Sequence, residues 1–300
     1  MFFVYYVFVF FINYAIVPRV NCFLCIVLQF KLTSQSIYKI SLFSHSALIM
    51  SHFSTTYQLR YHEIDQFGRP RIPALMTWLQ DTAILHTKSE GLDMADLLVQ
   101  GVTFVLSRLH LVLTRYPVPG ETVSVDTWIA CCDQRFMVRE YRLTGGDGAV
   151  IALATTSLSM ICFNNRLPVN IDDFLPKYPS DPVRAVDDPF DSLPEVSAAE
   201  YRISLPVLRS DLDRNDHVNN TIYAAWALES LPEEIVASHE MTGLEIRYRS
   251  EARYGEMITV ETQEVYRPDQ SGRCLLHRIS ANADQRELAR LVTCWRSTSL

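Results

Sequence analysis

Apolar positions along the chain follow two different periods, and the change from one period to the other predicts the order of the elements. Between Pro73 and Gly91, apolar residues recur every three or four positions, which is typical of a helix with one buried face. A second segment of this kind begins at Thr221. Each is followed by alternating or short apolar runs, which indicate strands. The pattern therefore predicts a helix and an antiparallel meander, each occurring twice.

The expected strands form two groups, separated by a segment rich in proline and aspartate between residues 168 and 194. This segment predicts an extended linker without a core of its own. Gly145, Gly146 and Gly148 predict a hairpin turn inside the first group. The expected strands cover residues 57–61, 103–113, 121–129, 136–143 and 150–163, then 202–207, 243–253, 256–266, 273–282 and 287–295, with a short helix expected at 94–99.

Matching landmarks in the two groups indicate a tandem duplication. Asp65 and Trp78, around the start of the first helix, have the same spacing as Asp213 and Trp226 at the second. The segment GETVSVDT, which begins at Gly120, recurs later as GEMITVET. Chance likeness between two helix-and-sheet units does not readily give several matches in the same order. We therefore interpret the chain as two copies of one unit.

The densest group of reactive side chains lies just before the second helix. The segment DLDRNDHVNN, residues 211–220, places Asp213, Asn215 and His217 in one loop. Turns and helix caps favour aspartate and asparagine, but they seldom need a histidine, which suits a base near neutral pH. One of the two asparagines that end the segment is expected to cap the helix. We therefore favour a catalytic role for this loop.

The first copy lacks this constellation. Where the second copy has its amide and imidazole, the first has Phe67 and Arg69. The comparison predicts a single active site in the second copy, with the first copy supplying the walls of a pocket for an apolar ligand. We expect Trp78 and Met76 of the first copy to contact the substrate.

Composition narrows the class of protein. The chain has 300 residues, of which 48% are hydrophobic, so it can form substantial cores and is not globally disordered. A net charge of −7 argues against a nucleic-acid-binding protein. The seven cysteines are scattered and odd in number, which favours reduced thiols over a disulfide framework. With no glycine-rich phosphate loop and no histidine pair at metal spacing, we expect neither cofactor nor metal.

Residues 1–50 differ from the rest because they contain no aspartate or glutamate and include long apolar runs. One interpretation is a membrane anchor, although each run is shorter than the ~20 residues of a spanning helix. The other is an upstream start that is not the true one, since polar, globular sequence begins at Met50. We favour the second interpretation, exclude residues 1–50 from the fold, and expect a cytoplasmic protein that contacts a membrane only if this leader is real.

From about Tyr57 to Trp295, the chain resembles the acyl-acyl carrier protein (acyl-ACP) thioesterases of plants and bacteria. The resemblance is carried by the motifs FVLSR, YPVPGETV, VDTW, DLDRNDHVNN and YRSEA. It implies an α+β tandem (double) hot-dog fold, in which each half is a long helix wrapped by an antiparallel β-sheet. The expected division is an apolar leader at 1–50, an N-terminal hot-dog domain at 51–170, a linker at 171–200 and a catalytic C-terminal domain at 201–300.

The resemblance also implies the site residues and the activity. It carries the catalytic role onto Asp213, Asn215, His217 and Glu251. Plant members have a cysteine at the position of Ala252, so a cysteine nucleophile at that position is excluded here. The implied reaction hydrolyses fatty acyl-ACP to a free fatty acid and ACP in fatty acid biosynthesis. The implied partner is acyl carrier protein with its acyl chain, and the protein is expected to be a monomer or homodimer.

Hydrolysis of a thioester needs a base for the attacking oxygen and donors for the oxyanion. We expect backbone N–H groups of Val218 and Asn219 to bind the oxyanion and Arg249 to contact the substrate. His217 or Glu251 is the expected base for a water, and direct attack by an aspartate carboxylate is the alternative. By its pattern alone, Glu251 belongs to a solvated charged face of a strand, so its role depends on the resemblance.

Three other activities are compatible with such a fold. A hot-dog acyl-CoA thioesterase would use the same chemistry on another carrier. A dehydratase or hydratase is disfavoured by the Asp-x-Asn-x-His loop and by Glu251. A non-enzymatic acyl-binding protein would usually carry an attached DNA-binding or signalling module, and the sequence beyond Met50 shows none.

Overall fold

A computed structural model gives the fold of two compact units, Met1–Met50 and Ser51–Leu300. It describes residues 7–12, 24–29, 40–44, 52–175, 180–214, 216–267 and 272–298. The described part of the smaller unit is a three-stranded antiparallel sheet of β1 (Val7–Ile12), β2 (Leu24–Gln29) and β3 (Ile40–Ser44). Among the described residues, no helix is both long and apolar enough to span a membrane. The assignment of residues 1–50 as a leader outside the fold stays a prediction.

The first repeat is a long helix with the strands that wrap it. The helix α1 (Ile72–Ser89) has Pro73 in its first turn, where a missing N–H leaves no hydrogen bond unmade. Its buried face carries Leu75, Trp78 and Leu79, as the helical period predicts. The other elements are β4 (His52–Gln58), a 3-10 turn (Tyr61–Glu63), α2 (Met94–Val99), β5 (Val102–Leu113), β6 (Thr122–Cys132), β7 (Phe136–Thr144) and β8 (Val150–Cys162).

The second repeat has the same plan. The helix α3 (Asn220–Glu229) follows the N-cap Asn219, whose side chain accepts a hydrogen bond from the N–H of Thr221. The sequence pattern missed α4 (Glu233–Ser238), a short helix in which Ile235 is the buried residue. The other elements are β9 (Tyr201–Pro206), a 3-10 turn (Arg209–Asp211), β10 (His239–Tyr248), β11 (Met257–Val265), β12 (Arg273–Ala281) and β13 (Glu287–Ser297).

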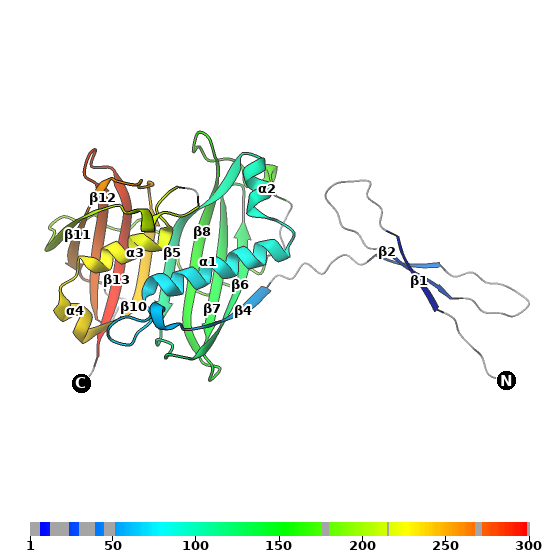
Figure 1. Cartoon of the computed structure of the whole chain (residues 1–300), viewed down its shortest axis with the longest axis horizontal. Helices are drawn as coiled ribbons and strands as arrows, with labels where there is room; N and C mark the ends of the chain where they lie inside the picture. The colour runs from blue at the N-terminus through cyan, green and yellow to red at the C-terminus, as the bar shows by residue number, and fades with distance from the viewer. Residues whose placement is uncertain are drawn as a thin grey trace, which may run out of the picture. The chain divides into compact units, whose positions relative to one another are not determined.

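The strands of both repeats form one ten-stranded antiparallel sheet, in the order β4-β6-β7-β8-β5-β10-β13-β12-β11-β9. The second half of this order mirrors the first, so β5 and β10 meet at the centre as the seam between the repeats. At the seam, Gly243 pairs with Val112 and Arg247 with Arg108. The helices α1 and α3 lie across the same face of the sheet (Figure 1). This is the tandem hot-dog architecture that the resemblance implies.

The main hydrophobic core lies between the helices and the sheet and draws on both repeats. Leu75 of α1, Leu111 of β5, Trp226 of α3 and Leu291 of β13 belong to one continuous cluster of buried side chains. Alternate residues of these strands face the cluster, as the two-residue period of a strand requires. The repeats therefore share a core rather than packing as two separate ones.

The described part of the linker, residues 180–200, crosses the sheet face that points away from the helices. Arg184 donates to the buried carboxylate of Glu140 at 2.7 Å, and the indole of Trp128 donates to the carbonyl of Val183 at 2.8 Å. Farther along, Arg290 donates to the carbonyl of Leu193 at 3.0 Å. The segment has no helix or strand of its own here, but polar contacts fix it to strands of both repeats.

Most expected strands shift by a few residues, and two end well before their expected ends. The strand expected at 57–61 ends at Gln58 because the chain then enters a 3-10 turn. The strand expected at 243–253 ends at Tyr248, since the N–H groups of the next two residues both donate to one carbonyl, that of Leu288. Glu251 therefore follows a strand instead of lying on a solvated strand face.

The expectation of reduced thiols is wrong for one pair of cysteines. Cys274 of β12 and Cys294 of β13 are directly opposite each other in the ladder and form a disulfide. The register brings their side chains together, which their separation of 20 residues does not reveal. Cys131, Cys132 and Cys162 are free thiols.

Candidate active site

The loop before α3 is a closed turn held by its own backbone. The N–H of Asp213 donates to the carbonyl of His217 at 2.7 Å, and the N–H of His217 donates back to Oδ1 of Asp213 at 3.3 Å. Leu212 and Val218 form a short bridge on either side. This geometry turns the His217 side chain toward the interior of a pocket, with 16% of it exposed.

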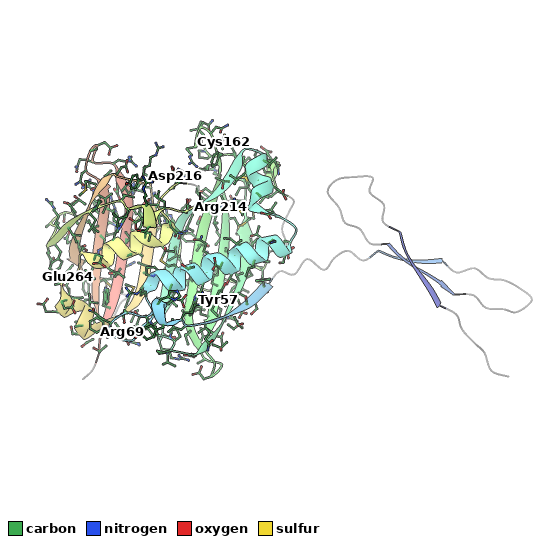
Figure 2. All side chains as sticks on the ribbon, in the orientation of Figure 1. Tyr57, Arg69, Cys162, Arg214, Asp216 and Glu264 are labelled. Carbon is green, nitrogen blue, oxygen red and sulfur yellow. A yellow bond between two sulfur atoms is a disulfide. The ribbon has the colours of Figure 1, made fainter. Side chains whose placement is uncertain are left out.

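The corresponding loop of the first repeat has the same geometry. The N–H of Asp65 donates to the carbonyl of Arg69 at 2.8 Å, and the N–H of Arg69 donates to Oδ1 of Asp65 at 2.8 Å. An aspartate thus shapes the loop in both copies, whether or not a histidine follows it. Figure 2 shows Arg69 at the end of the sheet opposite to Arg214, Asp216 and Cys162.

Arg69 is the first-repeat residue at the position equivalent to His217, and its side chain has a structural role. The guanidinium of Arg69 donates to the backbone carbonyls of His239 at 2.7 Å and Val236 at 3.3 Å. The Arg69 side chain therefore holds the first loop against α4 and the start of β10. The first-repeat loop therefore has no imidazole or amide like that of the second, and the expectation of a single active site stays a prediction.

Glu251 and His217 meet, although they are 34 positions apart in the sequence. Oε2 of Glu251 lies 3.2 Å from Nε2 of His217. Arg286 fixes the Glu251 segment by donating to its backbone carbonyl at 2.5 Å and to the hydroxyl of Ser250 at 3.1 Å. The hydroxyl of Tyr223 accepts a hydrogen bond from the next residue in the chain, Ala252, at 3.1 Å. The carboxylate is therefore presented from a fixed segment.

Two buried tyrosines support this geometry as neutral phenols. Burial raises the pKa of Tyr223 to about 12, which outweighs the opposing hydrogen bond from the N–H of Ala252. Burial also raises the pKa of Tyr248 well above its usual value. The Tyr248 hydroxyl donates to the carbonyl of Asn220 at 2.9 Å, at the first residue of α3. Each phenol therefore keeps its proton at neutral pH and ties together two parts of the site.

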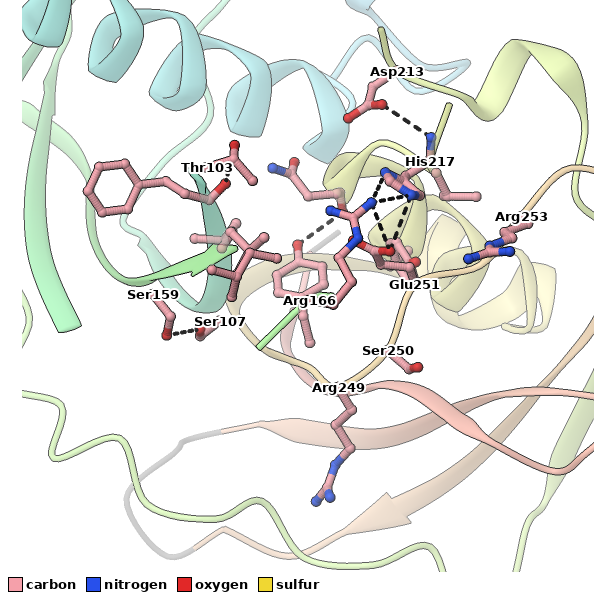
Figure 3. A pocket seen from close by; sticks show the side chains of 18 of the residues that line it. Thr103, Ser107, Ser159, Arg166, Asp213, His217, Arg249, Ser250, Glu251 and Arg253 are labelled. Atoms are coloured by element: carbon pink, nitrogen blue, oxygen red, sulfur yellow. Dashed lines mark hydrogen bonds and ion pairs between the residues drawn. The ribbon is translucent and has the colours of Figure 1, made fainter. Parts of the chain in front are cut away.

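Arg166, which the sequence did not single out, completes the cluster. Its Nη2 lies 2.7 Å from Nε2 of His217 and 3.6 Å from Oε2 of Glu251. Figure 3 shows its guanidinium pointing at both side chains. Arg166 follows β8 of the first repeat, so the site is built from both repeats. An arginine after an Asn-Asn pair is typical of a turn. No local pattern in the sequence indicates that its side chain contacts a histidine 51 positions away.

These side chains line a pocket of about 780 Å³. The first repeat contributes residues of β5 and β8, among them Phe104, Leu106 and Ile161. The second contributes Asp213, His217, Glu251 and the neighbouring loop residues. Charged groups thus lie beside apolar side chains in one recess, at the junction of the two repeats.

The structure argues against the expected oxyanion donors. The N–H of Val218 donates to the carbonyl of Ala252 at 3.4 Å, and the N–H of Asn219 donates to the carbonyl of Asp211 at 2.8 Å. Both donors already have backbone acceptors, because this stretch closes the loop before α3 begins. Neither N–H group is a free donor in the pocket, so the expected role in binding the oxyanion does not fit them.

Three expected substrate contacts are also placed differently. Trp78 and Met76 are almost completely buried in the core and do not line the pocket, because the inner face of α1 packs against the sheet. Arg249 lines the pocket, but its Nε lies 3.0 Å from Glu287, and its guanidinium points away from His217 (Figure 3). Asn215 lies outside the described residues.

The described residues contain no group of three or more His, Cys, Asp or Glu side chains with metal-binding geometry. What the site offers is an imidazole and a carboxylate in contact, a guanidinium beside them, and an apolar wall. This combination can accept a proton from water and hold a developing negative charge.

Two family models match the chain. One is described as the acyl-ACP thioesterase N-terminal domain and covers residues 50–178, and the other as the acyl-ACP thioesterase C-terminal domain and covers residues 195–297. A curated relative, the chloroplastic palmitoyl-acyl carrier protein thioesterase of Gossypium hirsutum, is 32% identical over 213 residues, or 66% of this chain and 52% of that protein. The chain thus spans about half the length of the curated relatives it matches.

Solved structures match over nearly their whole length. An acyl-ACP thioesterase from Bacteroides thetaiotaomicron is 25% identical with a TM-score of 0.72, covering 82% of this chain and 98% of that one. The 12:0-ACP thioesterase from Umbellularia californica is 25% identical with a TM-score of 0.73, covering 85% and 97%. These matches confirm the tandem hot-dog fold.

Proposed function

The chain belongs to the acyl-ACP thioesterase family, and on that premise we propose that it hydrolyses fatty acyl-ACP to a free fatty acid and ACP. The observation that carries the proposal is the contact of His217 and Glu251, at 3.2 Å, within a pocket that also has an apolar wall. A base beside an apolar recess is what cleavage of an acyl thioester requires. The reaction would serve fatty acid biosynthesis.

In the proposed mechanism, a water attacks the carbonyl carbon of the thioester. His217 or Glu251 takes the water proton as the new C–O bond forms. The C–S bond then breaks, and the thiol of the carrier leaves with a proton returned by the same pair. The guanidinium of Arg166 is the nearby cation that can favour negative charge at this end of the pocket.

Attack by water is favoured over attack by Asp213. The aspartate at the matching position of the first repeat, Asp65, makes the same hydrogen bond to the loop backbone without a histidine beside it. This supports a role for the Asp213 carboxylate in shaping the loop. Single turnover in ¹⁸O-water would leave no label in Asp213 if water attacks directly, whereas label in its carboxylate would establish the covalent route.

The acyl chain is proposed to lie against β5 and β8. Phe104, Leu106 and Ile161 line the same pocket as the His217–Glu251 pair and give it apolar side chains. This assignment replaces Trp78 and Met76, whose side chains belong to the core.

The test is hydrolysis of acyl-ACPs of several chain lengths by the full chain, with matched acyl-CoAs in parallel. We expect release of free fatty acid from acyl-ACP, and loss of at least ~100-fold in kcat for both His217→Ala and Glu251→Gln. His62→Ala, on an exposed 3-10 turn, is the matched control and should keep wild-type activity.

Three results would change the proposal. No release from any acyl-ACP would reject the function, and faster release from acyl-CoA would assign the acyl-CoA carrier instead. Near-normal turnover by a folded Glu251→Gln variant would reject the role of that carboxylate. Circular dichroism of each variant shows whether the fold is retained.

Acyl carrier protein is the proposed partner, and a monomer or homodimer the proposed assembly. The cytoplasmic location stays a prediction, and the cotton relative is described as chloroplastic. Fractionation of cells that express the full chain would show where the protein resides.

A further inference from the structure

We propose that Arg166 is a positioning residue that fixes where the proton sits in the His217–Glu251 pair. It does so by donating to the single lone pair of Nε2 of His217, which leaves the ring proton on Nδ1 and the Glu251 carboxylate as the open proton acceptor. Its effect on turnover rests on the proposed function, whereas the proton arrangement can be measured without any substrate.

The distances impose this arrangement. A guanidinium has only N–H donors, so an imidazole nitrogen 2.7 Å from Nη2 of Arg166 must be the acceptor. Nδ1 of the ring is farther from the same Nη2, at 3.5 Å. Nε2 of His217 is also 3.2 Å from Oε2 of Glu251, which is an acceptor when ionised. A single Nε2 site cannot donate to the carboxylate and accept from the guanidinium at once.

Without the guanidinium, the pair would adopt a different arrangement. Two acceptors at 3.2 Å repel each other unless a donor lies between them, so the ring proton would move to Nε2 and bond to Glu251. In that closed pair, the Glu251 carboxylate accepts from the ring and is less available to a water. Arg166, which also approaches Glu251 at 3.6 Å, is the donor that occupies Nε2 and so keeps the carboxylate open to a water.

The turn that carries Arg166 is built to hold it in place. The N–H of Arg166 donates to the carbonyl of Cys162 at 3.0 Å, and the N–H of Leu167 donates to Oδ1 of Asn165 at 3.0 Å. The guanidinium also lies 5.1 Å from the ring centroid of Phe163, a cation–π distance. The backbone of Arg166 is left-handed, with a φ of 61°, which a residue with a side chain adopts only when its surroundings hold it there.

The direct test is the protonation state of the His217 ring. Two-bond ¹H–¹⁵N correlation spectra distinguish a protonated ring nitrogen from an unprotonated one, and the signals of His217 are assigned by their loss in His217→Gln. At pH 8 we expect the Nδ1–H form in the wild type and the Nε2–H form in Arg166→Gln. The exposed Arg135→Gln, which removes the same charge from a residue outside the pocket, should leave the spectrum unchanged.

The lysine variant tests whether the tautomer depends on the donor at position 166 or on a change in the fold. Arg166→Lys keeps the charge and one donor, so it should restore part of the Nδ1–H form. In Arg166→Ala, added guanidinium ions should restore the Nδ1–H form. Such a rescue would also show that this variant is folded. An Nε2–H ring in the wild type, or the same tautomer in wild type and Arg166→Gln, would overturn the proposal.

Kinetics then tie the arrangement to turnover. Arg166→Gln should lower kcat at least ~10-fold with little change in KM, because the Glu251 base is then bonded to the ring while the apolar wall of the pocket is unchanged. In a Glu251→Gln background the same change should have a much smaller effect, since the two residues act through one pair. An active wild type with an unaltered kcat in Arg166→Gln rejects the positioning role, and a tautomer change in an inactive wild type rejects the thioesterase function alone.

Discussion

His277 shows what burial does to a single titratable residue in this protein. It lies fully buried on β12, with Nδ1 2.7 Å from the hydroxyl of Thr262 and Nε2 2.9 Å from that of Thr293. Burial lowers its pKa from 6.5 to about 3, because no charge is near enough to replace the lost water. The residue is therefore a neutral hydrogen-bonding member of the core and has no place at the pocket.

This residue makes folding stability sensitive to acid. In the unfolded chain His277 binds a proton below about pH 6.5, whereas the folded chain excludes it until about pH 3. Stability should be greatest above pH 6.5 and fall as pH drops toward 3, by up to ~1.4 kcal/mol per pH unit from this group. Urea unfolding at pH 7 and pH 5 should show a smaller acid loss for His277→Asn than for the wild type. An equal loss would contradict the burial argument, and the exposed His62→Asn provides the control.

At the scale of an element, the linker differs most from its expected character. Its composition predicts an extended segment without a core of its own, and residues 180–200 are extended, but they also make specific contacts with the sheet. The carboxylate of Glu140, which is completely buried, accepts from Arg184 at 2.7 Å, from the N–H of Ala185 at 2.9 Å and from the hydroxyl of Thr155 at 2.7 Å. The linker thus supplies the cation for a buried anion of the first repeat.

Removing that cation should destabilise the protein. Arg184→Ala leaves the Glu140 carboxylate buried without its charge partner, which should lower the free energy of unfolding by ~2 kcal/mol. Adding Glu140→Gln should recover part of the loss, because the buried charge is gone. Urea unfolding measures both, with the exposed Arg135→Ala as control. A loss no larger than that of the control would mean that the linker is only a tether.

At the scale of the whole molecule, the two repeats share both a sheet and a core. The seam of β5 and β10 continues the ladder from one repeat into the other, and buried residues of both helices belong to one cluster. The site depends on the same junction, because Arg166 comes from the first repeat and His217 from the second.

Unfolding of residues 51–300 should therefore be a single cooperative event. Neither half can separate without exposing the apolar surface of the common core. Pulsed hydrogen exchange along a urea series should give the same midpoint for peptides from β8 and from β13. Two separate midpoints would show that the repeats fold as independent domains.

Much of the fold and part of the site follow from the sequence. The period of α1 and the bounds of α2 at 94–99 were predictable because they depend on neighbouring residues in the chain. The doubling of the unit was predictable because the Asp65 and Asp213 loops carry the same local landmarks. The resemblance pointed to Glu251 and His217, which the structure brings together. The catalytic roles given to these residues, and to Asp213 and Asn215, stay predictions.

By itself, the sequence determined which elements form and which loop carries the imidazole, because periodicity, capping and turn chemistry act over a few residues. Tertiary structure alone decided that Arg166 contacts His217 and that Cys274 pairs with Cys294. It also decided that the N–H groups of Val218 and Asn219 donate to backbone carbonyls. Those contacts depend on strand register and on the seam between the repeats. Both are set by burial of the shared core across the whole chain, which no short stretch of sequence encodes.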